Sequence, residues 1–258
     1  MSSTFHSYSL YYDLLYQDKD YNGEAEYIRK LIAQWAPKTQ TILELGCGTG
    51  RHAELLCRMG YNIVGIEASE SMLTKSQERV SAPDNPNQKG SFEVQLGDAR
   101  KINLSREFHT VLSLFHVVSY QTSNEDLLAL FRTASRHLVA DGVFIFDVWY
   151  GPAVLTHRPE VRIKRIATKT HTITRLAEPR LDTSENTVDV HYNILIKSID
   201  GEILPGIEET HKMRYLFTPE IKLIAELNGM EILHAEEWLS SKSPSTDSWG
   251  VLFIARKK

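Results

Sequence analysis

A glycine-rich segment between an apolar run and a helical pattern constrains this chain more than any other feature. Its sequence is Glu44-Leu45-Gly46-Cys47-Gly48-Thr49-Gly50. Residues 41–43 before it predict a short buried strand, and residues 51–56 after it predict a helix. Glycines at alternate positions let the backbone turn sharply and approach a ligand without interference from Cβ atoms. The segment therefore predicts a nucleotide-type ligand loop at a strand-to-helix crossing, where open α/β sheets bind their ligands.

Strand patterns and helical patterns alternate from this segment to residue 150. The further strands are expected at residues 62–67, 92–96, 111–115 and 143–148. Ser69 can cap a helix after the first of these strands, and Thr122 to Glu125 can cap another that ends near His137. Upstream, residues 24–35 form an amphipathic helical pattern that Pro37 ends. Alternation of this kind predicts a doubly wound, mostly parallel α/β sheet.

The pattern changes after Gly151. β-branched alternation replaces helical periodicity in three stretches, residues 161–176, 187–199 and 207–217. They predict an antiparallel β excursion of three or more strands, with Asp200-Gly201 at a hairpin turn. The sequence Thr218-Pro219-Glu220 then starts a helix with Thr218 as its N-cap. Two last strands, at 230–237 and 250–256, are expected to bring the main sheet to seven strands.

Composition limits the partners of this chain. Its 258 residues include 29 Lys and Arg and 33 Asp and Glu, and the resulting net charge of −4 argues against nucleic acid as a partner. No apolar run approaches membrane-spanning length, and the N-terminus has no signal-peptide core, so no membrane is expected. A disulfide between Cys47 and Cys57 would distort the ligand loop. We therefore expect reduced thiols and a cytoplasmic protein.

The spacing around the glycines indicates the class of ligand. A dinucleotide loop has the pattern Gly-x-Gly-x-x-Gly, but Gly50 comes one residue too early for it, and the Lys of a phosphate-binding loop is absent. Glu44 would repel a pyrophosphate but could accept from an ammonium group. Glu67 ends the next strand about twenty residues further on, where a carboxylate accepts from ribose hydroxyls. The loop therefore predicts a positively charged adenosine ligand without phosphates.

These motifs resemble those of the class I S-adenosylmethionine-dependent methyltransferases. The resemblance rests on residues 44–50, on Glu67 and on Gly97-Asp98-Ala99 after the third strand. It implies S-adenosylmethionine as cofactor and S-adenosylhomocysteine as its product. The glycine segment would pack against the methionine part, Glu67 would bind the ribose and Asp98 would contact the adenine amine. The cofactor-binding residues expected on this basis are Tyr21, Glu44, Gly46, Cys47, Gly48, Gly50, Glu67, Ala68, Met72, Asp98, Ala99, Leu114 and Phe115.

A narrower resemblance, to the N,N-dimethyltransferases of nucleotide-linked deoxyamino sugars, extends over most of the chain. It is carried by residues 12–16, 19–21, 119–120, 190–192 and 208–218. Two motifs depart from that family, because Asp147-Val148-Trp149 stands in place of Glu-Pro-Trp and Trp249-Gly250-Val251 in place of Gly-Arg-Gly. The resemblance implies a small-molecule acceptor with an amine, for example an amino sugar.

The resemblance also implies a division of the chain. A single Rossmann-like methyltransferase domain is expected over residues 1–258. Its parts are an N-terminal aromatic lid and helix (1–36), the core (37–150 and 218–258) and the β insertion over the active site (151–217). The aromatic residues of the first part are Phe5, Tyr8, Tyr11, Tyr12, Tyr16 and Tyr21. Such a segment can cover a pocket, pack as a helix against the core, or do both.

Candidate catalytic residues follow from the chemistry of methyl transfer. The acceptor must be positioned and desolvated, and an amine must lose its proton before it attacks. Tyr120 is the first choice for contacting the acceptor, because it follows the fourth strand, where class I acceptors lie. Further candidates are His116, His191, His211, Glu209 and Asp147. The residues expected to bind the substrate are Tyr12, Tyr16, Tyr120, Trp149 and His211. No cluster has metal-ligand spacing, so no metal is expected.

The sequence leaves several other functions open. An O-methyltransferase or a glycine-type N-methyltransferase could share these motifs, and so could a non-catalytic protein that binds S-adenosylmethionine as a regulator. A nucleotide-dependent oxidoreductase would share the general loop. The absence of Asn/Asp-Pro-Pro-Tyr after the fourth strand counts against DNA adenine methylation. The β excursion could cover the pocket, form a contact in a homodimer, or do both.

Overall fold

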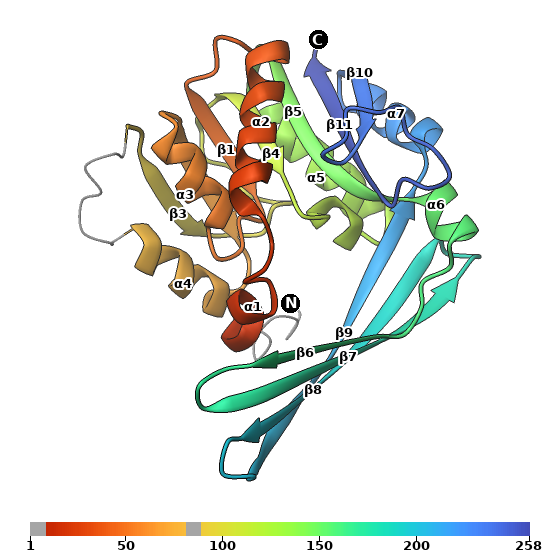
Figure 1. Ribbon diagram of the computed structural model, residues 1–258. Coiled ribbons are helices and arrows are strands. Elements are labelled where there is room, and N and C mark those ends of the chain that lie inside the picture. Colours follow the sequence, from red (N-terminus) through yellow and green to blue (C-terminus); the bar gives the residue numbers. More distant parts are fainter. Residues whose placement is uncertain (1–8, 81–88) are drawn as a thin grey trace.

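The core of the protein is a parallel sheet that the two C-terminal strands extend. The computed structural model describes residues 9–80 and 89–258. Within them, seven strands run in the order β3-β2-β1-β4-β5-β11-β10 (Figure 1). β1 to β5 pair in parallel, whereas β11 is antiparallel to β5 and β10 is antiparallel to β11. The strands are β1 (Thr41–Leu45), β2 (Asn62–Glu67), β3 (Phe92–Leu96), β4 (Phe108–Ser113), β5 (Leu138–Tyr150), β10 (Met230–Glu237) and β11 (Gly250–Lys257). The predicted fold class is confirmed.

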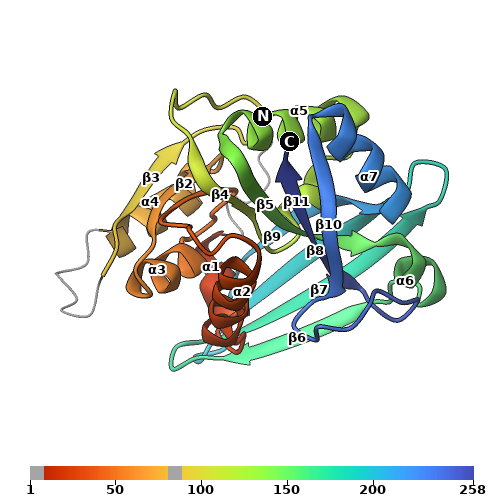
Figure 2. The same cartoon turned by 90° about the horizontal axis from the view of Figure 1, so that it is seen from above.

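Helices cover both faces of this sheet, because its strands send alternate apolar side chains to opposite faces. In β1, Ile42 packs with α2 and α3, whereas Leu43 packs with α5 and α7. The view from above shows these two layers on either side of the strands (Figure 2). The helices are α2 (Tyr21–Trp35), α3 (Arg51–Arg58), α4 (Glu70–Val80), α5 (Asn124–Arg136) and α7 (Thr218–Leu227). The packed layers make a rigid platform for the loops at the strand ends.

Four long antiparallel strands follow the fifth core strand and extend away from the core (Figure 1). They are β6 (Arg162–Ala167), β7 (His171–Asp182), β8 (Thr187–Ser198) and β9 (Ile203–Leu216). The predicted β excursion is confirmed, but the stretch 161–176 forms a hairpin rather than one strand. A short parallel pairing joins this sheet to the core, because Trp149 and Tyr150 of β5 pair with Tyr215 and Leu216 of β9. The insertion thus continues the core sheet beyond β5.

The N-terminal helix α1 (Ser9–Leu15) packs against this insertion. Leu15 is fully buried among apolar side chains of β6 to β9, which include Ile166 and Ile194. Helix α2 begins nearby, where the Asp20 carboxylate accepts from the backbone N–H of Gly23 and so satisfies one of the first-turn donors. Phe5 and Tyr8, two members of the predicted aromatic segment, lie outside the described residues.

Several element boundaries differ from the sequence-based expectations. β4 ends at Ser113 instead of residue 115, because the next residues leave the extended conformation. The last helix has Phe217 rather than Thr218 as its N-cap, and the backbone N–H of Phe217 donates to the carboxylate of Glu220. A short helix, α6 (Gly151–Thr156), precedes the insertion and was not expected. Most of the loop expected at 82–90 lies outside the described residues.

The cysteines and the helix lengths bear on the environment that was predicted for the protein. Both cysteines, Cys47 and Cys57, are buried and reduced in the structure. Across residues 9–80 and 89–258, no helix combines the length and apolar character that crossing a membrane requires.

We expect Leu15→Ala to loosen the N-terminal helix without unfolding the core. Removing a buried leucine side chain costs about 2–5 kcal/mol, and here the lost contacts lie between α1 and the insertion. Hydrogen exchange should therefore speed up in α1 and in the facing strands, while β1 and β4 keep their protection. Leu223→Ala is the matched control, because Leu223 is 57% exposed on α7. Equal exchange in both variants would contradict this account of how α1 is held.

Candidate active site

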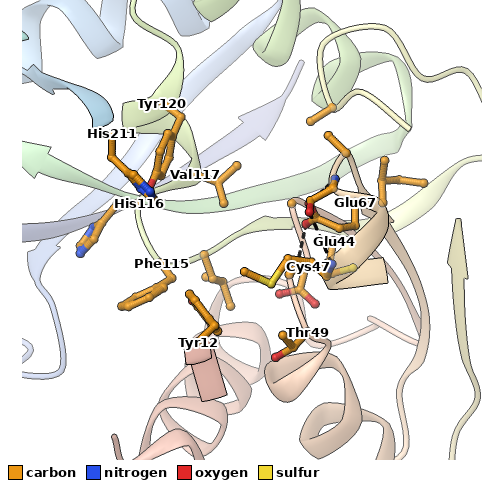
Figure 3. Close-up of a pocket in the computed structure, with 18 of the residues that line it drawn as sticks. Tyr12, Glu44, Cys47, Thr49, Glu67, Phe115, His116, Val117, Tyr120 and His211 are labelled. Carbon is orange, nitrogen blue, oxygen red and sulfur yellow. Dashed lines mark hydrogen bonds between the residues drawn. The ribbon is translucent and has the colours of Figure 1, made fainter. Parts of the chain in front are cut away.

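A cavity of about 670 Å³ opens at the carboxyl ends of β1 to β4. Figure 3 shows its two sides, with Glu44, Cys47 and Glu67 on one and Tyr120 and His211 on the other. Of the residues that the sequence analysis selected, most line this cavity: Tyr12, Tyr16, Tyr21, Glu44, Gly46, Cys47, Gly48, Glu67, Ala68, Met72, Asp98, Ala99, Leu114, Phe115, His116, Tyr120, Trp149 and His211. The predicted residues are thus brought together from distant parts of the chain.

The glycine segment adopts a conformation that requires glycine. Gly46, Gly48 and Gly50 have φ values of +79°, +57° and +77°, in the left-handed region that residues with a Cβ avoid. At Gly46, a Cβ would lie 2.7 Å from the Val117 side chain. At Gly48, a Cβ would meet no atom of the described chain within 4 Å. Gly46 therefore permits close packing, and Gly48 leaves open space where a ligand can approach the backbone.

Glu44 is a buried carboxyl group with an unused acceptor. Its residue is 1% exposed, and its Oε2 has no hydrogen-bond partner among residues 9–80 and 89–258. Burial, with a smaller contribution from the negative charge of Glu67, raises the pKa of Glu44 to about 8. Burying a charge without a partner is costly. A ligand cation beside Glu44 would provide the missing partner.

Glu67 holds the glycine loop from the end of β2. Its Oε2 accepts from the backbone N–H of Gly48 at 2.8 Å, and its Oε1 accepts from the backbone N–H of Ser69 at 2.8 Å. Burial raises the pKa of Glu67, although these N–H donors act in the opposite direction. Ala68 and Met72 line the cavity next to it. The carboxylate is thus fixed at the end of β2, beside the glycine loop.

Asp98 is held in place by an arginine two residues further on. Arg100 donates through Nε to Oδ1 at 2.8 Å and through a terminal nitrogen to Oδ2 at 2.7 Å. Arg100 also pairs with Asp126 of α5 at 2.7 Å. Partial burial works against the charged carboxylate, but the hydrogen bonds from Arg100 prevail and lower the pKa of Asp98. Asp98 is therefore an ionised acceptor at the edge of the cavity.

A tight turn after β4 presents several cavity residues. Phe115 and His116 both have left-handed backbones, with φ of +62° and +64°. The Asp147 carboxylate accepts from the backbone N–H of His116 at 3.1 and 3.2 Å, and its Oδ2 lies 2.6 Å from His116 Nδ1. The 3₁₀ helix η1 (Val117–Tyr120) follows directly. Asp147 therefore stabilises a turn whose first residues, Leu114 and Phe115, were expected to belong to the fourth strand.

The side of the cavity that faces the glycine segment is aromatic. Tyr120 and His211 share a hydrogen bond of 2.8 Å between the phenol oxygen and Nδ1. The His211 ring also makes an edge contact with Tyr192, with ring centroids 4.9 Å apart. Tyr16 packs edge-on against Phe115 with centroids 5.2 Å apart. α1, η1, β5, β8 and β9 all contribute to this side.

Four selected residues are not among those that line the cavity of the described chain: Gly50, Asp147, His191 and Glu209. Adjacent side chains of a strand point to opposite faces, and in β8 Tyr192 takes the inward position. His191 instead contacts Thr210 Oγ1 at 3.2 Å, so we do not retain it as a catalytic candidate. At Gly50, a Cβ would meet Ser76 and Phe92, which gives this glycine a packing role.

Several lining residues were not among those predicted from the sequence: Thr49, Arg51, Ser69, Arg100, Val117, Tyr192 and Met213. Thr49 and Arg51 stand within or next to the glycine segment, so proximity to the motif was an available signal. Tyr192 stands next to the selected His191, and only the strand register decides between the two. Val117 and Met213 are apolar residues, and no sequence pattern distinguishes such cavity residues from core residues.

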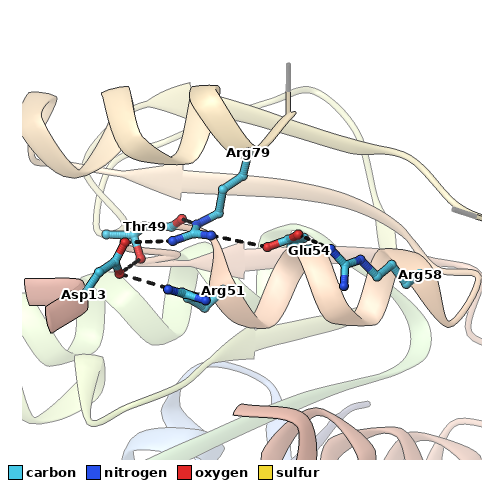
Figure 4. Close-up of polar contacts among 6 residues, drawn as sticks. All are labelled: Asp13, Thr49, Arg51, Glu54, Arg58 and Arg79. Carbon is cyan, nitrogen blue, oxygen red and sulfur yellow. Dashed lines mark hydrogen bonds and ion pairs between the residues drawn. The ribbon is translucent and has the colours of Figure 1, made fainter. Parts of the chain in front are cut away.

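A polar network ties the N-terminal helix to the glycine loop (Figure 4). The carboxylate of Asp13 accepts from the Thr49 hydroxyl at 3.0 Å and pairs with Arg79 of α4 at 2.7 Å. Arg79 also donates through Nε to the backbone carbonyl of Thr49 at 2.7 Å. Arg51 lies 3.8 Å from the same aspartate. Asp13 thus anchors α1, and with it Tyr12 and Tyr16, over the cavity.

Comparisons with known proteins agree with this geometry. A family model for a methyltransferase domain matches residues 42–142. The chain is 29% identical over 227 residues to a dTDP-3-amino-3,4,6-trideoxy-α-D-glucopyranose N,N-dimethyltransferase of Streptomyces venezuelae, which covers 87% of this chain and 90% of that protein. The crystal structure of Streptomyces venezuelae DesVI covers 100% of both chains at 23% identity and a TM-score of 0.79. S-adenosylmethionine-bound CalS10, an amino pentose methyltransferase from Micromonospora echinaspora, covers 100% of this chain and 99% of its own at 21% identity and a TM-score of 0.77.

The domain match includes β1 to β4, the glycine segment, Glu67 and Asp98, which lie on one side of the cavity. The predicted cofactor is therefore confirmed as S-adenosylmethionine, and the predicted enzyme class is confirmed as well. The chain is an S-adenosylmethionine-dependent methyltransferase with the class I fold, similar to the N,N-dimethyltransferases of nucleotide-linked deoxyamino sugars.

Proposed function

We propose that this enzyme methylates an amine of a small molecule, with an amino sugar as the acceptor class that is best supported. The observation that carries the proposal is the division of one cavity into two chemically different halves (Figure 3). The half at the ends of β1 to β3 is lined by carboxylates. The half formed by α1, η1, β8 and β9 is lined by tyrosine and histidine side chains.

The carboxylate half suits the cofactor. The unpartnered Oε2 of Glu44 fits the ammonium group of the methionine part, and the open space at Gly48 allows the ligand to contact the loop. Glu67 would hold the ribose hydroxyls and Asp98 the adenine amine. When bound, S-adenosylmethionine supplies a methyl group on a positively charged sulfur, which a neutral amine can attack. The loop holds the cofactor and excludes water.

The aromatic half suits an amine. Tyrosine faces attract cations, and Tyr12, Tyr16, Tyr120 and Tyr192 line the cavity. Rings around the cavity would therefore favour a substrate ammonium, and the Tyr120 hydroxyl would contact its nitrogen. The names of the similar proteins support the same acceptor class, because they specify amino sugars.

The remaining expectations about partners belong to this proposal. The net charge of −4 supports a small molecule rather than nucleic acid as substrate. Two buried, reduced cysteines support a cytoplasmic location. Exposed apolar side chains on the insertion, among them Ile163 and Leu195, support the predicted homodimer. Light scattering of the purified chain would test the dimer.

We expect Glu67→Ala and Asp98→Ala to weaken binding of S-adenosylhomocysteine, each by about 10-fold or more. Each variant removes one hydrogen-bonding carboxylate from the cofactor half and leaves the buried core of the sheet unchanged. Isothermal titration calorimetry measures the affinity, and circular dichroism should show an unchanged fold. Glu93→Ala is the control, because the Glu93 side chain is 69% exposed. Wild-type affinity in both variants would remove these residues from the site.

We expect Glu44→Gln to change how the stability of the ligand-free chain depends on pH. The pKa of Glu44 is near 8 in the folded chain and about 4.3 in the unfolded chain, so the folded state favours the protonated form. Wild-type stability therefore falls as pH rises from about 4.5 to about 8. Glutamine lacks this penalty, so the variant should gain about 2–4 kcal/mol over the wild type at pH 8.5 relative to pH 4.

Urea unfolding at both pH values measures the effect on the ligand-free chain. The same variant should bind S-adenosylhomocysteine more weakly, because the partner of the ligand ammonium is gone. Glu93→Gln provides a matched exposed control. If the free energy of unfolding changed equally with pH in the wild type and in Glu44→Gln, the pKa of Glu44 would not be raised in the folded chain.

The proposed reaction can be tested with matched acceptors. The enzyme and S-adenosylmethionine are incubated with dTDP-3-amino-3,4,6-trideoxy-α-D-glucopyranose, with the analogue that carries a hydroxyl in place of the amine, and with glycine. Mass spectrometry should detect one or two added methyl groups on the amino sugar only. Methylation of the hydroxyl analogue alone would identify an O-methyltransferase, and methylation of glycine alone would contradict the sugar assignment.

The same assay tests the acceptor side of the cavity. Tyr120→Phe should lower kcat by about 100-fold and leave the affinity for S-adenosylhomocysteine within about 3-fold. Tyr61→Phe is a control, because Tyr61 lies outside the cavity lining of the described chain. Normal turnover in Tyr120→Phe would remove this hydroxyl from the reaction.

A further inference from the structure

Three polar side chains form a line from the cavity into the insertion. Tyr120 of η1 lies 2.8 Å from Nδ1 of His211, and Nε2 of His211 lies 3.3 Å from Oε2 of Glu209. The side chains of His211 and Glu209 are 3% and 9% exposed. Tyr120 and His211 line the cavity, whereas Glu209 is not among the lining residues of the described chain. Figure 3 shows the Tyr120 hydroxyl meeting the His211 ring.

The chemistry of these groups fixes the direction of the hydrogen bonds. An ionised carboxylate can only accept, so the ring nitrogen that faces Glu209 must carry a hydrogen. In neutral His211 the other nitrogen, Nδ1, is then an acceptor, and Tyr120 must donate its O–H to it. The carboxylate thus sets the tautomer of the imidazole and leaves the lone pairs of the Tyr120 oxygen directed away from the ring.

Strand geometry places Glu209 and His211 on one face of β9. Residues two apart in a strand share a face, and the buried Ile207 and Met213 belong to the same inward row. Glu208, between Ile207 and Glu209, points outward and accepts from the Asn193 side chain at 3.2 Å. The chain therefore offers two adjacent glutamates, of which only the inward one contacts the histidine.

We propose that Tyr120, His211 and Glu209 form a proton relay that deprotonates the amine acceptor, with Glu209 as the positioning residue. The inference rests on the proposed function, since it assigns a base to the amine. Two other histidine–carboxylate pairs involve residues that line the cavity. His52 pairs with Glu24 at 2.7 Å, and Glu24 also pairs with Lys19. The remaining pair is His116 with Asp147. Both Asp147 oxygens are engaged by the backbone N–H of His116, so that pair serves the turn after β4.

The relay conserves protons and charge. The N–H bond of the acceptor ammonium breaks, its electron pair stays on nitrogen, and the proton forms a bond to the Tyr120 oxygen. At the same time the original Tyr120 proton forms a bond to His211 Nδ1. The positive charge moves from the ammonium to the imidazolium, which the Glu209 carboxylate stabilises. After the product leaves, the proton returns through Tyr120 to solvent, and a second methylation can use the same path.

The relay can be tested through the tautomer of His211 without any acceptor. Full-length chain with ¹⁵N-labelled histidine and bound S-adenosylhomocysteine is examined by NMR. Wild type should show His211 with Nε2 protonated and Nδ1 unprotonated. In Glu209→Gln the amide can donate to Nε2, so the Nδ1-protonated tautomer should gain population. Glu208→Gln, the outward neighbour, should retain the wild-type pattern. An unchanged tautomer in Glu209→Gln would overturn the positioning role.

Kinetics then test whether the tautomer matters for the reaction. With an acceptor methylated in the matched assay, Glu209→Gln should lower kcat by about 100-fold and change the KM for S-adenosylmethionine by less than about 3-fold. Glu209→Asp should recover part of the loss. Wild-type kcat in a folded Glu209→Gln variant with an altered tautomer would overturn the relay. Methylation of a hydroxyl instead of an amine would defeat the proposed function, while the tautomer comparison would still decide the role of Glu209.

Discussion

Both halves of the site depend on the contact between the Asp147 carboxylate and the backbone N–H of His116. Phe115 and His116 are consecutive residues with a left-handed backbone. Each such conformation costs about 1–2 kcal/mol for a residue with a Cβ. Asp147 lies inside the packed strand β5 and is 1% exposed. Its carboxylate therefore holds the strained turn from a buried position in the core sheet.

This turn fixes the positions of two side chains, Val117 and Tyr120. Val117 is brought so close to the glycine loop that no side chain fits at position 46. One turn of 3₁₀ helix later, Tyr120 meets His211 of the insertion. A single anchored turn thus sets the floor of the cofactor half and the wall of the acceptor half. The separation of Val117 and Tyr120 is accordingly set by a turn that Asp147 anchors to the core sheet.

The ligand loop and the two acidic residues beside it, Glu44 and Glu67, could be predicted because their sequence patterns are local. Gly46, Gly48 and Gly50 stand at a strand-to-helix crossing, and Glu67 ends the next strand, so short-range patterns identify them. The turn after β4 could not be predicted, because Leu114 and Phe115 continue an apolar run that resembles a buried strand. Its left-handed backbone is stabilised by Asp147, which is distant in sequence, and no local pattern reports that contact.

The error at His191 has a different physical origin. Strand β8 was predicted correctly, but which of two adjacent residues faces the cavity depends on register, and a shift by one residue exchanges the two faces. His191 and Tyr192 are equally compatible with the sequence pattern. The inward face is selected by the long antiparallel pairing of β8 with β9, a property of the whole insertion.

The short pairing between β5 and β9 fixes the register of β9 relative to the core sheet, and with it the position of His211. Trp149 and Tyr150 pair with Tyr215 and Leu216, and His211 and Glu209 lie on the same strand face as Tyr215, four and six residues earlier. Because side chains alternate along a strand, this pairing places His211 and Glu209 on the face that meets Tyr120. The two-residue junction with β5 therefore sets which face of β9 meets Tyr120 of η1.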